Sequence, residues 1–212
     1  MIPLRARAMF NRLGTSLAAV VLLLACAAPA EPAAANKLLD DLMVAFNGES
    51  IAQARYVAFA KKADQEGYAG VASLFRVAAR GEEIHAKAHA ELIRKLGGTP
   101  VADVKLQPIK STAENLKSAI EGESYERDKM YPEFISDAMA AGSKDAIKDF
   151  KAVVAVEAEH AKLFAQAASS LPSWKTARKY FLCQTCGLCV VVIDFAKCPI
   201  CFTETDDFVE VT

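Results

Sequence analysis

The chain has 212 residues, enough for one buried domain and a small appended unit. Its formal net charge of -1 and pI near 6.3 provide no basic surface, which argues against nucleic acid or an anionic membrane surface as a partner. One Cys lies at position 26 and the other five lie between positions 183 and 201, so the long middle region is not a disulfide scaffold.

Residues 1-30 are predicted to be an export signal rather than part of the fold. Several Arg residues form a basic start, and the apolar run 17-25 is much shorter than the about twenty residues that span a bilayer. Cleavage at the small residues 28-30 would give a periplasmic protein. Leu23-Leu24-Ala25-Cys26 alternatively resembles a bacterial lipobox, with Cys26 carrying a lipid anchor. An uncleaved N-terminal anchor helix is the remaining alternative. We expect an exported protein, either periplasmic or a membrane-anchored lipoprotein.

Four helices are predicted between residues 36 and 171, which form the first domain. Their approximate ranges are 36-65, 68-96, 111-142 and 143-171. Helical periodicity in each range and the abundance of Ala favour an all-α bundle. The stretch between the second and third helices contains Pro100 and Pro108 and is long enough to cross from one end of a bundle to the other.

Capping residues and glycines support these helix boundaries. Ser111 and Glu114 read as a capping box, and Ser143 is the expected N-cap of the fourth helix. The second helix should stop at Gly97-Gly98. Pro132, inside the third helix, predicts a kink or local break.

Each helix has an apolar seam with residues spaced alternately by three and four, and each seam is interrupted near its middle by acidic or imidazole side chains. The interrupting residues are Glu49, Glu82, His85, Glu123, Glu126, Glu157 and His160. Burying one unpaired carboxylate costs several kcal/mol or shifts its pKa until it is neutral. Any one of these residues alone would be interpreted as a surface acid or a packed core imidazole. Their coincidence on four seams instead predicts a metal site.

The ligand types indicate which metal is bound. Glu82/His85 and Glu157/His160 each place a carboxylate and an imidazole one helical turn apart on one face. Carboxylate-rich sites with one imidazole per ion suit iron or manganese rather than structural zinc. A Glu from each of two helices and a Glu-x-x-His from each of the other two is the ligand set of ferritin-like di-iron bundles.

The remaining polar seam residues complete this set. Glu49 and Glu123 would be the single carboxylates, and Glu126 is an additional ligand candidate. His89, one turn beyond His85, is interpreted as a supporting or packing residue rather than a ligand.

Residues 178-212 form the second predicted domain. Cys183-x-x-Cys186 and Cys198-x-x-Cys201 are two metal knuckles whose four thiolates suit one tetrahedral iron or zinc. A pair of disulfides is the alternative, which an exported location would favour. Cys189 is left over as a free thiol. Four aromatic residues are expected to pack a small dry core around the knuckles: Phe181, Phe195, Phe202 and Phe208.

At these residues the chain resembles rubrerythrin over roughly residues 36 to 212. The first helix has Phe46-Asn-Gly-Glu49-Ser with Tyr56 two turns on, and the second has Glu82-Glu-Ile-His85-Ala-Lys. The third has Gly122-Glu123-Ser-Tyr-Glu126 followed by Met130-Tyr131-Pro132, and the fourth has Glu157-Ala-Glu-His160.

The resemblance implies a di-iron four-helix bundle joined to a rubredoxin-like domain with one tetrathiolate iron, acting as a peroxide reductase in oxidative-stress defence. Glu82 and Glu157 would bridge the irons, and His85 and Glu126 would be alternative ligands to one of them. The di-iron ligands implied are Glu49, Glu82, His85, Glu123, Glu126, Glu157 and His160, with Tyr56 and Tyr131 hydrogen-bonded to ligand carboxylates.

The partners implied by the resemblance are hydrogen peroxide, an electron-donor protein or reductase, and a second copy of the chain. In such homodimers the rubredoxin-like domain of one subunit lies near the di-iron site of the other. Two rival functions remain open on the sequence. One is a ferroxidase or iron-binding protein without donor-dependent peroxidase activity. The other is a non-catalytic lipoprotein that docks a partner through a zinc ribbon.

Overall fold

The computed structural model describes residues 32-212. The predicted export signal, its cleavage site and Cys26 therefore lie outside the described residues. Within residues 32-212, no helix is both long enough and apolar enough to span a membrane.

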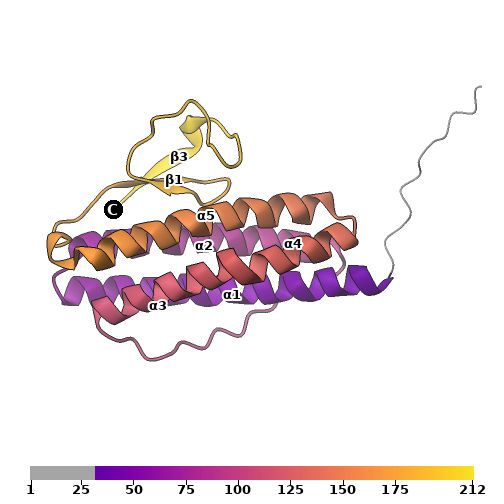
Figure 1. Cartoon of the computed structure of the whole chain (residues 1–212), viewed down its shortest axis with the longest axis horizontal. Helices are drawn as coiled ribbons and strands as arrows, with labels where there is room; N and C mark the ends of the chain where they lie inside the picture. The colour runs from indigo at the N-terminus through magenta and orange to yellow at the C-terminus, as the bar shows by residue number, and fades with distance from the viewer. Residues whose placement is uncertain (1–31) are drawn as a thin grey trace, which may run out of the picture.

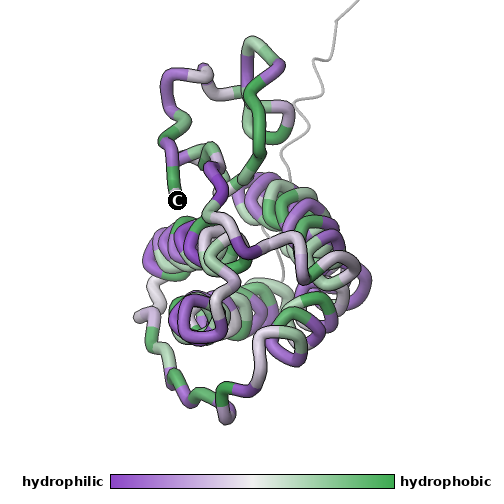
Figure 2. The backbone as a smooth tube through the Cα atoms, turned by 90° about the vertical axis from the view of Figure 1, so that its left-hand side faces the viewer, coloured by the Kyte–Doolittle hydropathy of each residue, from purple (hydrophilic) through white to green (hydrophobic). Residues whose placement is uncertain are grey.

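The predicted bundle is confirmed. α1 and α2 pack along one another, and α3 and α4 together form a third rod against α5 (Figure 1). Viewed from the side in Figure 2, the helices surround a common centre and the C-terminal unit lies outside them. The bounds are α1 Pro32–Gln65, α2 Ala69–Lys95, α3 Thr112–Tyr125, η1 Glu126–Met130, α4 Tyr131–Ala140 and α5 Lys144–Ser169.

The break predicted at Pro132 is a π-helical turn, η1, which divides the third helix into α3 and α4. Pro132 has no backbone N–H, so the regular α-helical bond to the carbonyl four residues back cannot form. The Tyr131 N–H instead donates to the Glu126 carbonyl, five residues back. Turns of this kind inside α-helices are frequent at functional sites.

The expected caps are present at α3 and α5. At α3, the Ser111 side chain accepts from the Glu114 N–H, and the Glu114 carboxylate accepts from the Ser111 N–H. At α5, the Ser143 side chain accepts from the Ala146 N–H. Leu96 follows the buried Leu92 by one helical turn, yet it is 43 % exposed. The reason is that α2 ends at Lys95 and the chain turns away through Gly97, whose φ of 83° favours glycine.

Two apolar clusters fill the bundle on either side of its polar middle. One contains Tyr56, Phe75 and Phe164, and the other contains Tyr131 and Phe150. Six of the seven polar seam residues are buried in this middle region, and Glu126 is partly buried.

The C-terminal unit is a three-stranded antiparallel sheet of order β2-β1-β3. Its elements are η2 Leu171–Ser173, β1 Tyr180–Cys183, β2 Cys189–Val190, η3 Thr205–Asp207 and β3 Phe208–Val211. The prediction of an aromatic core around the knuckles is wrong for Phe202, which is 71 % exposed. Phe195 and Phe208 do pack together, with ring centroids 5.5 Å apart.

The connection between bundle and sheet is fixed to the start of α2. The Gly70 N–H donates to the Trp174 carbonyl at 2.9 Å, and the Arg178 N–H donates to the Ser73 hydroxyl at 3.2 Å. A Cβ on Gly70 would lie 2.6 Å from the Thr176 carbonyl oxygen, so only glycine permits this approach. The connection thereby places the C-terminal unit over α2 and α5 (Figure 1).

Candidate metal centres

The acidic and imidazole residues of the four seams meet in the middle of the bundle. Two groups of four ligand atoms form, and within each group the atoms lie within 4.8 Å of one another. The first group is Glu49, Glu82, His85 and Glu157, and the second is Glu82, Glu123, Glu157 and His160. Glu82 and Glu157 belong to both groups, as bridging carboxylates must. Six of the seven residues predicted on the seams thus lie around one centre. The seventh, Glu126, belongs to neither group.

Both imidazoles turn the same ring atom toward the shared carboxylates. His85 Nδ1 lies 3.1 Å from Glu82 and 2.9 Å from Glu157. His160 Nδ1 lies 3.2 Å from Glu82 and 3.0 Å from Glu157. A helical Glu-x-x-His pair facing inward produces this geometry on each side.

Unpartnered oxygens show that the centre fits cations. Each of four buried carboxylates has one oxygen without a hydrogen-bond partner: Glu49 Oε2, Glu82 Oε1, Glu123 Oε2 and Glu157 Oε1. Glu82 Oε1 and Glu157 Oε1 lie 3.2 and 2.9 Å from an imidazole Nδ1, but two imidazoles cannot balance four buried carboxylates, so the cluster requires further positive charge. The donor set of carboxylates with two imidazoles fits two iron ions.

The pKa shifts of the buried carboxylates show that like charges repel one another in this cluster when no cation is present. Burial, with the negative charges of Glu82 and Glu157, raises the pKa of Glu49 to about 7. Burial and the same two neighbours raise the pKa of Glu123 well above its ordinary value. Burial acts on Glu157 in the same sense, but the two imidazoles hold its pKa well below the ordinary range. The cluster alone therefore cannot keep every carboxylate charged.

Two buried tyrosines secure the single carboxylates. The Tyr56 hydroxyl donates to Glu123 Oε1, and the Tyr131 hydroxyl donates to Glu49 Oε1. In both cases the other carboxylate oxygen is the unpartnered one. Each tyrosine thus holds one oxygen and leaves the second directed to the metal position.

Glu126 begins η1 and lies at the margin of the centre. Its Oε1 is 3.9 Å from the point where a Cβ on Gly48 would be, and the residue is partly buried. Burial and the negative charge of Glu49 raise its pKa well above the ordinary value. In this arrangement His85 is within the first ligand group and Glu126 is outside it.

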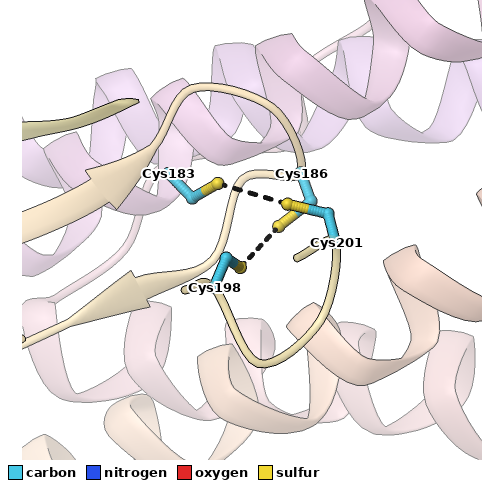
Figure 3. Close-up of side chains that lie close together, drawn as sticks. All are labelled: Cys183, Cys186, Cys198 and Cys201. Carbon is cyan, nitrogen blue, oxygen red and sulfur yellow. Dashed lines mark hydrogen bonds between the residues drawn. The ribbon is translucent and has the colours of Figure 1, made fainter. Parts of the chain in front are cut away.

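The four cysteines predicted as knuckles converge between two loops (Figure 3). The Cys183–Cys201 and Cys186–Cys198 sulfur distances are both 3.6 Å, and all four sulfurs lie within 4.8 Å of one another. A disulfide would require about 2.05 Å. Thiolates about 2.3 Å from a central tetrahedral ion are about 3.8 Å apart, so the cluster fits one metal ion.

The two centres meet through His85. Its Nε2 lies 3.1 Å from the Cys186 carbonyl oxygen, while its Nδ1 faces the bundle carboxylates. The approach is close, because a Cβ on Gly187 would lie 2.8 Å from His85 Nε2 and 3.2 Å from the Gly81 Cα. The resemblance implied such an approach across a homodimer, whereas here both centres belong to one chain.

Sequence reasoning missed several residues around the centre. Asp149 binds His89 Nδ1 at 2.7 Å, although nothing in its position beside a seam residue distinguishes it from a surface acid. Cys189, expected to be a spare thiol, is 1 % exposed and lies beside the His160 ring. A cleft of about 300 Å³ between bundle and sheet is lined by His85, Asp149 and Cys186, among others.

Comparisons with known proteins agree with this architecture. The family model described as Rubrerythrin matches residues 40–168. Nigerythrin of Nitratidesulfovibrio vulgaris is 35% identical over 176 residues, covering 82% of this chain and 87% of its own. Rubrerythrin-2 of Clostridium acetobutylicum is 32% identical over 172 residues, covering 80% of this chain and 94% of its own.

Solved structures show the same likeness. A nigerythrin in its fully reduced, all-ferrous state matches with a TM-score of 0.76 and 35% identity, covering 82% of this chain and 86% of that chain. A bacterioferritin of Desulfovibrio desulfuricans matches with a TM-score of 0.61 at 20% identity, covering 68% of this chain and 84% of that chain, which shows the fold alone.

Proposed function

Because this chain belongs to the rubrerythrin family of di-iron proteins, we propose that it is a peroxidase that reduces hydrogen peroxide to water. Its electrons arrive through the rubredoxin-like tetrathiolate iron from an external donor protein or reductase. The reaction consumes two electrons and two protons for each peroxide.

The bundle residues have separate roles in this proposal. When bound, the two irons supply the electrons and polarise the O–O bond. Glu82 and Glu157, which belong to both ligand groups, would hold both ions, Glu49 and Glu123 would hold one each, and the two imidazoles would complete the set. Glu126, which belongs to neither ligand group but whose pKa the Glu49 charge raises, would be an alternative to His85 as a ligand of the ion on the Glu49 side. Tyr56 and Tyr131 hold the single carboxylates in place.

The observation that carries the proposal is the position of His85 between the two centres. One ring nitrogen faces the shared carboxylates and the other lies 3.1 Å from the carbonyl of a tetrathiolate cysteine. A pure iron-storage bundle needs no such connection. In this proposal, the contact between His85 and the Cys186 carbonyl gives electrons a short covalent and hydrogen-bonded route from Cys186 to the di-iron site.

The first experiment combines metal analysis with rapid mixing. Purified protein is expected to hold about three irons per chain, two in the bundle and one in the thiolate site. After anaerobic reduction, peroxide should reoxidise both centres, followed by the return of the tetrathiolate colour. Glu82→Ala and His160→Ala should lower turnover about 100-fold or more. Glu83→Ala is the matched control, because Glu83 adjoins Glu82 but its side chain is 50% exposed.

A second variant separates electron delivery from the peroxide reaction. Cys198→Ser should abolish donor-dependent turnover but preserve one rapid oxidation of the pre-reduced bundle. Full turnover in Glu82→Ala and His160→Ala would show that the site assignment is wrong. Ferrous iron oxidation by oxygen without donor-dependent peroxide turnover would instead establish the ferroxidase alternative. A colourless zinc-loaded thiolate site would indicate a docking role for the C-terminal unit.

We also propose that the protein is exported, on the basis of the basic start and short apolar run in residues 1-30. The mass of the mature protein recovered from a bacterial host tests this directly. Cleavage near residue 30 gives an unmodified periplasmic protein, whereas a diacylglyceryl adduct at Cys26 gives a lipoprotein. An intact N-terminus on cytoplasmic material would contradict export.

A further inference from the structure

His89 is fully buried in α2, one turn beyond His85, and both of its ring nitrogens have partners. Nδ1 lies 2.7 Å from Asp149 Oδ2 on α5. Nε2 lies 3.0 Å from the Tyr131 hydroxyl on α4. A residue that only filled space would not need a polar contact at each end.

The direction of the hydrogen bonds follows from the number of protons. The Tyr131 hydroxyl has one hydrogen, which it donates to Glu49 Oε1. Its oxygen must therefore accept the hydrogen of His89 Nε2, while the Asp149 carboxylate accepts that of Nδ1, so that His89 in this arrangement is the doubly protonated imidazolium. The result is a continuous chain Asp149–His89–Tyr131–Glu49 across four helices. Its inner end holds one oxygen of Glu49 and leaves the other for the metal.

The opposite side of the centre has no comparable extension. Tyr56 holds Glu123 in the same way, but its ring packs against Phe59, Phe75 and Phe164, with centroids 6.1, 5.6 and 5.3 Å away. The two metal positions therefore differ in the groups that surround the tyrosine bound to their single carboxylate. The Glu123 side is closed by aromatic rings, and the Glu49 side is linked to an acid in the cleft between bundle and sheet.

We propose that Asp149 and His89 are positioning residues for the metal ion held by Glu49 and His85. Asp149 orients the His89 ring, the ring orients the Tyr131 hydroxyl, and the hydroxyl fixes the Glu49 carboxylate with its free oxygen toward the ion. Hydrogen bonds to ligand carboxylates typically change metal affinity by about 10-100-fold. The inference rests on the metal centre of the proposed function but not on its peroxidase activity.

The test is an anaerobic titration of the apoprotein with ferrous iron or, as a spectroscopic probe, Co²⁺. Glu49→Gln and Glu123→Gln assign the two bundle binding steps, because each removes a ligand of one position. Asp149→Asn should weaken the Glu49-side step about 10-fold and leave the Glu123-side step unchanged. His89→Leu should likewise weaken only the Glu49-side step. Tyr56→Phe should weaken only the Glu123-side step.

Asp145→Asn is the matched control. Asp145 lies on the same helix and lines the same cleft, but its side chain is 69% exposed and its contact is a surface pair with Lys95 at 3.3 Å. It should alter neither step. The tetrathiolate absorbance gives an internal reference in every sample.

Two results would overturn the proposal. If Asp149→Asn left both bundle steps at wild-type affinity, the chain of hydrogen bonds would have no positioning role. If it weakened both steps equally and lowered the melting temperature of the apoprotein, its role would be general stability. Neither result depends on turnover, so a protein that binds metal selectively but does not reduce peroxide would refute only the proposed function.

Discussion

At the scale of single residues, glycine determines how close the two centres come. Gly187 has a φ of 81° and Gly81 lies directly against it, with 3.2 Å between the Gly81 carbonyl oxygen and a Cβ placed on Gly187. A Cβ on Gly187 would meet His85 Nε2 at 2.8 Å and a Cβ on Gly81 would meet the Gly187 carbonyl oxygen at 3.2 Å, so a larger residue at either position would push the loop away from the bundle. The absence of two side chains thus maintains the 3.1 Å contact.

Gly187→Ala should slow electron transfer from the tetrathiolate site to the bundle by about 10-fold or more, since the added methyl would meet His85 Nε2 at 2.8 Å. Metal content should be unchanged. The measurement is stopped-flow absorbance of the pre-reduced protein mixed with peroxide. Gly67→Ala is the control, because Gly67 has a similar φ of 80° but nothing within 4 Å of an added Cβ. Equal slowing in both variants would mean that backbone strain, not the lost contact, causes the effect.

At the scale of elements, η1 sets the angle between Glu123 and Tyr131. The π turn contains an extra residue relative to a continuous α-helix, so everything after it is rotated by about 100°. This rotation allows α3 to direct Glu123 at the centre while α4 directs Tyr131 at Glu49 on the other side.

Pro132→Ala should weaken metal binding on the Glu49 side about 10-fold. The restored N–H can bond the Asp128 carbonyl, which favours a regular α-helix and turns Tyr131 away from Glu49. Metal titration of the apoprotein checks this. Pro108→Ala, in the exposed crossover, is the control. Wild-type affinity in Pro132→Ala would show that the π turn is maintained by the metal ligands rather than by proline.

Glu66 connects the end of α1 to the start of α3. Its carboxylate faces the Thr112 hydroxyl and accepts the Thr112 N–H at 2.8 Å, and the hydroxyl together with the N–H lowers its pKa from the ordinary 4.5 to about 2. A group with a lowered folded pKa contributes its stability above the unfolded pKa and loses it as the pH falls toward the folded value. The contribution is therefore complete above about pH 4.5 and disappears as the pH approaches 2. The side chain is 28% exposed, so screening limits it to about 1 kcal/mol.

Glu66→Gln should lower the free energy of unfolding of the apoprotein by about 1 kcal/mol at pH 7. The difference from wild type should shrink as the pH falls from 4.5 toward 2, because Glu66 of the unfolded chain takes up a proton in this range while folded Glu66 stays charged. Urea unfolding at several pH values measures this. Glu121→Gln, with a side chain 68% exposed, is the control. A difference that is independent of pH would attribute the effect to packing.

The elements and most of the centre could be predicted because helical periodicity records which face of a helix is buried. Glu49, Glu82, Glu123 and Glu157 stood out as charges on such faces. Periodicity contains no information on which residue lies opposite across the bundle. Asp149 could therefore not be paired with His89, and the burial of Cys189 against the bundle depends on docking of the sheet.

At the scale of the whole molecule, one chain brings both centres together. The linker is fixed to α2 by Gly70 and Ser73, and Trp174 in it is 3 % exposed. These contacts orient the sheet over α2 and α5 of the same chain (Figure 1). The proposed electron transfer would then need no partner subunit, even in an assembly of two copies.

Co-expression of two inactive variants tests this. Cys198→Ser lacks the tetrathiolate metal and Glu82→Ala lacks the di-iron site, so a mixed assembly has one intact centre of each kind on different chains. With transfer within one chain, donor-dependent turnover should remain below about one tenth of wild type. Recovery to about a quarter or more would place the functional contact between subunits. Co-expression of each variant with wild type controls for assembly.

Next to the metal centres, the contact between bundle and sheet is made by a carbonyl oxygen, an imidazole and two glycines, and the buried side chains of Tyr180, Leu182 and Val211 complete it by packing with the apolar cluster of the bundle. Such a joint places few demands on the identity of side chains elsewhere on the C-terminal unit. Its exposed apolar residues, Val191, Val192 and Phe202, are free to diverge without disturbing the joint. Over evolutionary time, surface substitutions alone could therefore exchange one electron donor for another, while the proposed reaction at the bundle centre stays unchanged.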